Sequence, residues 1–158
     1  MIGYTQVYRP GIGIVATAPL GSPIELLQGD VLRVDVSFQY KVAQESSCTL
    51  VGVIGLMDAP AAMGKASISL PPVADFTVRF ATVDIPTGAG GWFRTATPPG
   101  IYNLLVWIEE APHIYDEIPN AVIVAEKPSL IASIMSPMMM IMMMGMMIPL
   151  VSEGMEQR

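Results

Sequence analysis

Hydrophobic and polar residues alternate most strictly between Asp30 and Val42. One set of alternate positions is apolar: Leu32, Val34, Val36, Phe38, Tyr40 and Val42. The other set is polar: Arg33, Asp35, Ser37, Gln39 and Lys41. Because successive side chains of a strand point to opposite faces, this period of two predicts a β-strand with one buried face and one solvent-facing face.

Further strands are predicted after this one, with clear departures from regularity in two of them. Their ranges are 49–57, 65–70, 76–85, 101–109 and 121–125. Gly52 and Gly55 in the first range indicate a bulge or a close backbone approach. In the third range the apolar positions change phase between Phe80 and Val83, which predicts a bulge near Ala81–Thr82.

Turns rich in Gly and Pro separate these runs, and no helical pattern lies between them. About seven strands between residues 24 and 126 predict an all-β fold, an antiparallel β-sandwich of ordinary domain size. The predicted organisation has three parts. Residues 1–23 form a turn-rich arm or edge strands, residues 24–127 form the sandwich, and residues 128–158 form a Met-rich hydrophobic segment, expected to be helical, with a short polar tail.

The run from Pro99 to Ile108 carries a family resemblance. Gly100 and Tyr102 place a Gly-x-Tyr pattern at the start of a predicted strand, which resembles the penultimate strand of immunoglobulin-like folds. The pattern is also similar to adhesion-type sandwich modules called CARDB-like. The resemblance implies a Tyr102 hydroxyl bonded back to the preceding loop and a scaffold that rarely carries a catalytic site. The paired cysteines of antibody domains are absent.

The C-terminal region is dominated by one apolar segment. Residues 129–151 read SLIASIMSPMMMIMMMGMMIPLV, without a charged residue. As one helix this segment would span roughly 34 Å, enough for a bilayer core of about 30 Å. Pro137 and Pro149 bracket a shorter run that would reach only about 18 Å. Spanning therefore requires a kinked helix that begins near Leu130.

Three interpretations of this segment stay open. It is a membrane anchor, it packs against copies of itself or another structural protein, or its thioethers bind Cu(I). The copper interpretation is the weakest, because no His or Cys accompanies the methionines. Gly145 would allow close helix contact. The positions assigned to assembly or membrane contact are Leu130, Ile134, Met138, Met142, Gly145 and Met146.

Charge and cysteine content narrow the possible partners. The net charge is −6, and the eight basic residues are scattered, so a nucleic-acid partner is not expected. Residues 1–25 lack the basic start and unbroken apolar core of a secretory signal peptide. Cys48 is the only cysteine. We expect it to be a buried, inert thiol, with an intermolecular bridge as the alternative.

The sequence contains little that predicts chemistry. His113 is the only histidine, and it lies near Glu109, Glu110, Asp116 and Glu117 in what we expect to be a solvated acidic loop. No zinc or calcium ligand spacing, nucleophile elbow or phosphate loop is present. We therefore predict no catalytic residue, no metal and no cofactor.

Two tryptophans are candidates for contact with a partner protein. Trp92 follows a flexible loop tip, and Trp107 lies opposite in phase to Tyr102, Leu104 and Val106. Trp107 should then face away from the core, either toward a partner or packed within the chain.

The sequence as a whole favours a non-enzymatic structural protein. The expectation is a virion component of a phage or an archaeal virus, a homo-oligomer whose sandwich packs in or decorates an assembly and whose Met-rich tail oligomerises or anchors it. The alternative is a cellular tail-anchored membrane protein with an immunoglobulin-like binding domain, held in the membrane through residues 129–151. Localisation would accordingly be the virion or a membrane.

Overall fold

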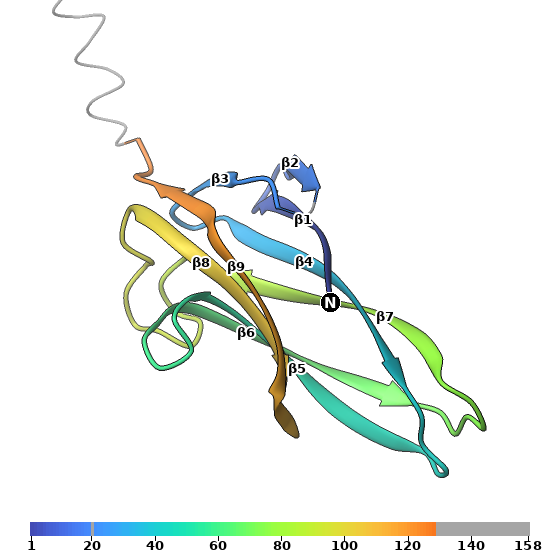
Figure 1. The fold of residues 1–158 in the computed structure, drawn as a ribbon. Coiled ribbons are helices and arrows are strands. Elements are labelled where there is room, and N and C mark those ends of the chain that lie inside the picture. Colours follow the sequence, from blue (N-terminus) through green and yellow to red (C-terminus); the bar gives the residue numbers. More distant parts are fainter. Residues whose placement is uncertain (20, 129–158) are drawn as a thin grey trace, which may run out of the picture. The chain divides into compact units, whose positions relative to one another are not determined.

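The computed structural model describes residues 1–19 and 21–128, whose regular elements are all β-strands (Figure 1). In chain order the strands are β1 (Ile2–Arg9), β2 (Gly13–Pro19), β3 (Ile24–Leu27), β4 (Val31–Tyr40), β5 (Ser46–Gly55), β6 (Pro60–Leu70), β7 (Thr77–Pro86), β8 (Gly100–Ile108) and β9 (Ala111–Ala125). Seven strands, β3 to β9, lie between residues 24 and 126, in agreement with the predicted number of about seven, although β3 was not among the predicted ranges.

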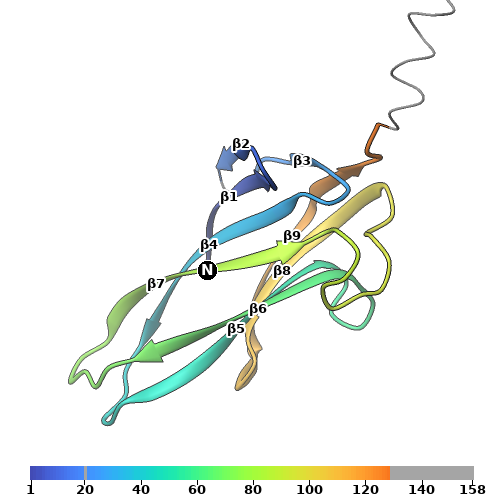
Figure 2. The ribbon, with the colours of Figure 1, turned by 180° about the vertical axis from the view of Figure 1, so that it is seen from behind.

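The strands form two sheets that face each other (Figures 1 and 2). The four-stranded sheet has the order β2-β1-β4-β7, and the five-stranded sheet has the order β3-β9-β8-β5-β6. Neighbouring strands are antiparallel, except that β3 pairs with β9 in parallel. The prediction of an all-β sandwich is confirmed at this level.

The core lies between the two sheets and is filled by alternate residues of each strand. In β4, all the predicted inward positions from Leu32 to Tyr40 are buried, while Arg33, Asp35 and Ser37 on the other face are only partly covered. Leu50 and Ile54 of β5 and Leu104 and Val106 of β8 meet them from the other sheet. The strict alternation of this strand was therefore a sound guide to its faces.

The first 19 residues form one edge strand, β2, and one interior strand, β1, of the four-stranded sheet. β1 is an interior strand that pairs with both β2 and β4, and Val7 is fully buried. One compact unit accordingly extends from Met1 to Glu126. The sequence signal was weak here because the alternation around Thr5 and Val7 is short and is followed closely by Pro10 and two glycines.

Strand β7 contains no bulge, contrary to the sequence prediction. Its pairing with β4 runs without a shift from Val31↔Pro86 to Tyr40↔Thr77. Val83 and Ile85 face the core, whereas Val78 and Phe80 lie on the outer face and are exposed. The change of phase therefore reflects apolar residues placed on the solvent side of a regular strand.

The two glycines of β5 have the roles expected from the sequence. A Cβ on Gly52 would lie 2.9 Å from side-chain atoms of both Val83 and Ile85, so this glycine permits close packing across the core. At Gly55 the pairing with β6 shifts register, and φ is +120°. Gly55 thus marks a bulge in a conformation that favours glycine.

Strand β9 begins ten residues earlier than predicted. It starts at Ala111, so the acidic stretch around His113 is part of a hairpin with β8 rather than a loop. Asn120, with φ of 53°, interrupts the regular backbone just after Pro119. The many polar residues and Pro119 concealed this strand, because its outward positions are solvated.

Candidate interaction site

Strand β6, at the edge of one sheet, runs in contact with β7, at the edge of the other. A Cβ on Gly64 of β6 would lie only 1.9 Å from the backbone oxygen of Asp84 in β7. Real Cβ atoms do not approach this closely, so only glycine allows the two backbones to meet. Gly64 therefore brings the two sheet edges together on this side of the sandwich.

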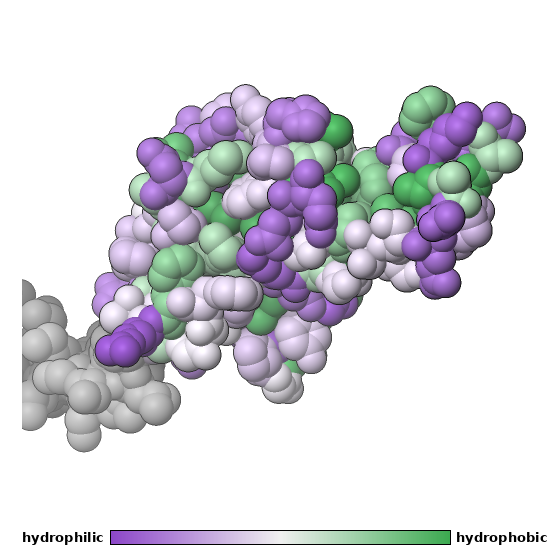
Figure 3. All heavy atoms as spheres, turned by 90° about the horizontal axis from the view of Figure 1, so that it is seen from below, coloured by the Kyte–Doolittle hydropathy of each residue, from purple (hydrophilic) through white to green (hydrophobic). Residues whose placement is uncertain are grey.

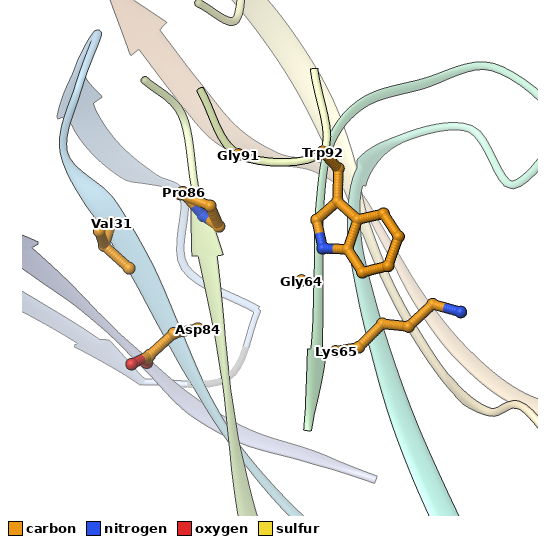
Figure 4. Close-up of a pocket in the computed structure, with 7 residues that line it drawn as sticks. All are labelled: Val31, Gly64, Lys65, Asp84, Pro86, Gly91 and Trp92. Atoms are coloured by element: carbon orange, nitrogen blue, oxygen red, sulfur yellow. The ribbon is translucent and has the colours of Figure 1, made fainter. Parts of the chain in front are cut away.

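A groove of about 720 Å³ follows this junction (Figure 4). Its lining residues come from both sheets and from the loop after β7, and they are Val31, Gly64, Lys65, Asp84, Pro86, Gly91 and Trp92. In Figure 4 the indole of Trp92 stands on one side, with Pro86 and Val31 on the other. Trp92 is 60% exposed. It is therefore a large aromatic surface at the rim of a groove.

The loop that carries Trp92 is fixed by hydrogen bonds on both sides. The Thr97 backbone N–H donates to the Thr87 carbonyl at 2.9 Å, and the Thr97 hydroxyl donates to the Ala61 carbonyl at 3.2 Å. Thr87 is itself buried, and its hydroxyl donates to the Asp30 carbonyl at 2.7 Å. Because both ends of the loop are held, Trp92 is presented from an anchored support.

Two ion pairs flank the groove. Lys65 pairs with Glu109, and its Nζ lies 5.3 Å from the centre of the Trp92 ring, within range of a cation–π contact. On the opposite wall, Arg33 makes a bidentate pair with Asp84 at 2.8 and 2.9 Å. The groove is thus lined by apolar residues and by the exposed indole of Trp92, and its charged residues form ion pairs within the chain. That arrangement suits a mixed polar and apolar segment of another protein.

Trp107 faces away from the core, as its phase predicted, but it is covered by its own chain. It is 9% exposed and packs with Val51, Val53 and Leu105, with Met63 against the same cluster. These residues share the outer face of the five-stranded sheet. Of the two tryptophans, Trp92 alone offers substantial surface to a partner.

The start of β8 has the geometry implied by the family resemblance. The Tyr102 hydroxyl donates a hydrogen bond to the Pro98 carbonyl at 2.8 Å. A Cβ on Gly100 would lie 3.3 Å from atoms of the Tyr102 ring. The Gly-x-Tyr pattern therefore ties the long loop back onto the strand that follows it.

The residues around His113 do not converge on a site. His113 is exposed on β9, and no group of three or more His, Cys, Asp or Glu within residues 1–19 and 21–128 is placed to hold a metal ion. Burial opposes the charged form of Asp116, but hydrogen bonds from the Ile2 backbone N–H and the terminal ammonium lower its pKa overall. Asp116 therefore joins β9 to the start of β1.

Cys48 is buried, as expected. Burial raises the pKa of its thiol, and the negative charge of Glu110 raises it further. A neutral, covered thiol is a poor nucleophile, which fits a packing role.

A row of exposed apolar side chains precedes and enters β7. Phe76, Val78 and Phe80 are 74%, 47% and 77% exposed. We call these three residues the apolar ridge. The sequence pattern revealed their shared face but not that this face is open to solvent. In the view of Figure 3, hydrophobic and hydrophilic residues are mixed over the surface.

The predicted assembly or membrane positions lie outside the described residues. They are Leu130, Ile134, Met138, Met142, Gly145 and Met146. Within the described part of the chain, no helix has the length and apolar character needed to cross a bilayer.

Comparison with known proteins gives little further guidance. No protein-family model matches the sequence, and no curated protein matches it either. Among solved structures, the chain is similar to part of a β-glucuronidase from glycoside hydrolase family 2. The identity is 19% and the TM-score 0.39, and the match covers 74% of this chain and 11% of that chain. A likeness at this level carries no argument about activity.

Proposed function

We propose that this protein is a non-enzymatic structural protein whose sandwich packs against other subunits of an assembly. The observation that carries the proposal is the apolar ridge. Single exposed apolar residues are common on protein surfaces, but two on one strand face and a third just before that strand form a patch that water solvates poorly. Covering such a patch with a protein partner lowers the free energy, because apolar surface is removed from water.

Trp92 supports the same function from a different part of the surface. Tryptophan is enriched among the residues that dominate binding energy at protein interfaces. Here it stands over a groove and is carried by an anchored loop. We infer that Trp92 contacts a second partner surface in the assembly.

We further propose that the sandwich is of the immunoglobulin-like, adhesion-module type. Support comes from the two packed sheets and from the hydrogen bond that the Tyr102 hydroxyl donates to the Pro98 carbonyl. A small sandwich followed by an uncharged apolar segment fits a virion component, and this is the setting that we favour. Homo-oligomers and other structural proteins are the proposed partners.

The Met-rich segment, residues 129–151, is proposed to oligomerise or anchor the chain. Support comes from its composition, because 23 positions without charge need cover from water. The test compares the full chain with a variant that lacks residues 129–151, by analytical ultracentrifugation with and without detergent. Defined oligomers of the full chain in the absence of detergent, reduced in size by the deletion, are the expected result. A monodisperse monomer at all concentrations would contradict the proposal.

A tail-anchored membrane protein is the second candidate. The length of the uncharged segment favours it, since a kinked helix of 23 residues reaches the thickness of a bilayer core. In that case the full chain should float with liposomes in a density gradient, and the deletion variant should not. Once detergent is added, the full chain should also run as a small species.

A further inference from the structure

The outer face of β4 and β7 carries charge of opposite sign at its two ends. Residues paired across these antiparallel strands share a face, so Gln39 with Val78, Ser37 with Phe80 and Asp35 with Thr82 form successive outward rows. Inward rows alternate with them; in these rows Phe38 and Val36 of β4 are buried, and so are both Val34 and Val83. The outer face therefore has a defined order from one end to the other.

One end of this face is basic. Lys41 follows β4 directly, and its Nζ lies 5.9 Å from the centre of the Phe76 ring. Arg79 pairs with Phe38 in an inward row, so it does not belong to this face. Glu45 is the acidic residue nearest to Lys41 in sequence, and Asp75 directly precedes Phe76. By its phase in the strand, Lys41 is therefore the cation that this end of the outer face presents.

The other end is acidic. The guanidinium of Arg33 is held by Asp84 in a bidentate pair. Asp35, in the next row, accepts a hydrogen bond from the Thr82 hydroxyl at 2.6 Å. Two carboxylates therefore stand against one cation. The apolar ridge residues Val78 and Phe80 occupy the rows between the two ends.

This order of basic, apolar and acidic rows is complementary to itself when turned by half a turn. We propose that a second copy of this chain docks on this face around a two-fold axis that passes near the level of Phe38. Asp35 and Lys41 lie three positions on either side of that level. In a two-fold contact, residue i meets residue j and j meets i, so each Lys41 faces the Asp35 of the other copy.

The apolar ridges of the two copies meet at the centre of this contact. Sheets packed face to face lie about 10 Å apart with interleaved side chains, so phenylalanine side chains on both faces can fill that space. If the two copies instead packed with their β4 strands running in the same direction, each charged residue would face a residue of the same charge. The proposal deepens the proposed function, on which it rests, by naming a second copy as one partner and this face as the contact.

The first test is disulfide capture in the full chain. Gln39→Cys places an exposed thiol near the proposed axis, where it should meet its own copy and give a covalent dimer under mild oxidation. Cys48 is buried, so it should contribute few disulfide-linked dimers of its own. Ile101→Cys, on exposed surface of the other sheet, is the matched control. Equal yields of dimer from the two variants would overturn the proposal.

The second test is charge reversal with rescue, in the Gln39→Cys background. Lys41→Asp and Asp35→Lys should each lower the rate of dimer capture at least about tenfold, because like charges then face each other. The double variant should recover most of the rate, since the pairs are restored in reversed order. A double variant no better than the single ones would contradict the two-fold arrangement.

The two proposals fail in different ways. Loss of capture at Gln39→Cys, with oligomers of the full chain still present by ultracentrifugation, would reject this face and retain the assembly function. Capture that persists when residues 129–151 are deleted would retain this face and reject the Met-rich segment as the sole source of self-association.

Discussion

At Gly64, the absence of a side chain determines how closely the backbones of β6 and β7 can approach each other. The neighbour of Gly64 is the Asp84 backbone oxygen, which cannot rotate away as a side chain would. Any Cβ at this position must push β6 and β7 apart, and the groove beneath Trp92 would change with them.

Gly64→Ala should therefore lower the free energy of unfolding by about 2 kcal/mol or more, as overpacking of a tight contact does. Gly3→Ala is the matched control, because a Cβ there would lie 3.4 Å from the Asp35 backbone oxygen, near ordinary contact. Urea denaturation followed by circular dichroism measures both. Similar unfolding midpoints for the two variants would contradict the interpretation of Gly64 as a contact residue.

Asp30 is a second position where one residue joins several parts. Its carboxylate is almost fully buried and accepts two hydrogen bonds from Arg9, both at 2.9 Å, and one from the Leu27 backbone N–H at 3.0 Å. It therefore connects β1 to the turn between β3 and β4.

Asp30→Asn removes the charge with little change in volume. We expect a loss in unfolding free energy larger than that of the control, because the buried side chain no longer accepts charge-assisted hydrogen bonds from Arg9. Asp84→Asn is the control, because its pair with Arg33 is exposed and should contribute less than about 1 kcal/mol. The comparison needs only chemical denaturation of both variants.

At the scale of an element, the corner formed by Tyr102 and Pro98 attaches the loop before β8 to the strand. Tyr102→Phe keeps the ring and removes the hydroxyl, so we expect a loss of about 1 kcal/mol. Tyr115→Phe, on an exposed tyrosine of β9, should change stability little. A Tyr102→Phe variant as stable as the unmodified protein would show that this hydrogen bond contributes nothing net.

Strands β4 and β7 show where the sequence pattern was sufficient to predict which side chains are buried and where it was not. β4 was predictable because its buried and exposed positions differ in polarity at every step from Leu32 to Tyr40. In β7 the same logic led to a false bulge, because Phe80 is apolar yet faces solvent. The alternation of hydrophobic and polar residues gives the polarity of each position. It predicts burial correctly only where the solvent-facing positions are polar.

The site was less predictable than the fold. Trp92 was identified from its position after a flexible loop tip, but the groove depends on Gly64 and Asp84, which belong to different sheets. Only the three-dimensional pairing brings such residues together. Burial of Trp107 likewise depends on Val51 and Met63 of neighbouring strands.

At the scale of the whole molecule, acidic residues link distant segments and make stability depend on pH. Hydrogen bonds from the Thr49 backbone N–H outweigh desolvation and lower the pKa of Glu110, and the Ile2 N–H helps to lower that of Asp116. A carboxyl with a lowered pKa in the folded state binds protons more weakly than in the unfolded state. Its stabilising effect is then complete above the unfolded value, about 4.

We therefore expect stability to be flat above about pH 5 and to fall as the pH drops through the lowered pKa values. Denaturation midpoints measured from pH 7 to pH 3 would show this decline. Glu110→Gln and Asp116→Asn should each make the decline shallower. An unchanged slope in both variants would mean that other carboxyls control the acid limb.

The parallel pairing of β3 with β9 has a consequence for the order of folding. Ile24 to Leu27 pair with Val122 to Ala125, so the two partners are separated in sequence by five other strands. β9 is also an interior strand of its sheet. During synthesis, the five-stranded sheet cannot be completed until β9 has left the ribosome. Pairing over such a distance in sequence is slow to form. A nascent chain stalled before residue 111 should therefore remain sensitive to protease and dependent on chaperones, and release of β9 should close the fold just as the apolar residues behind it emerge.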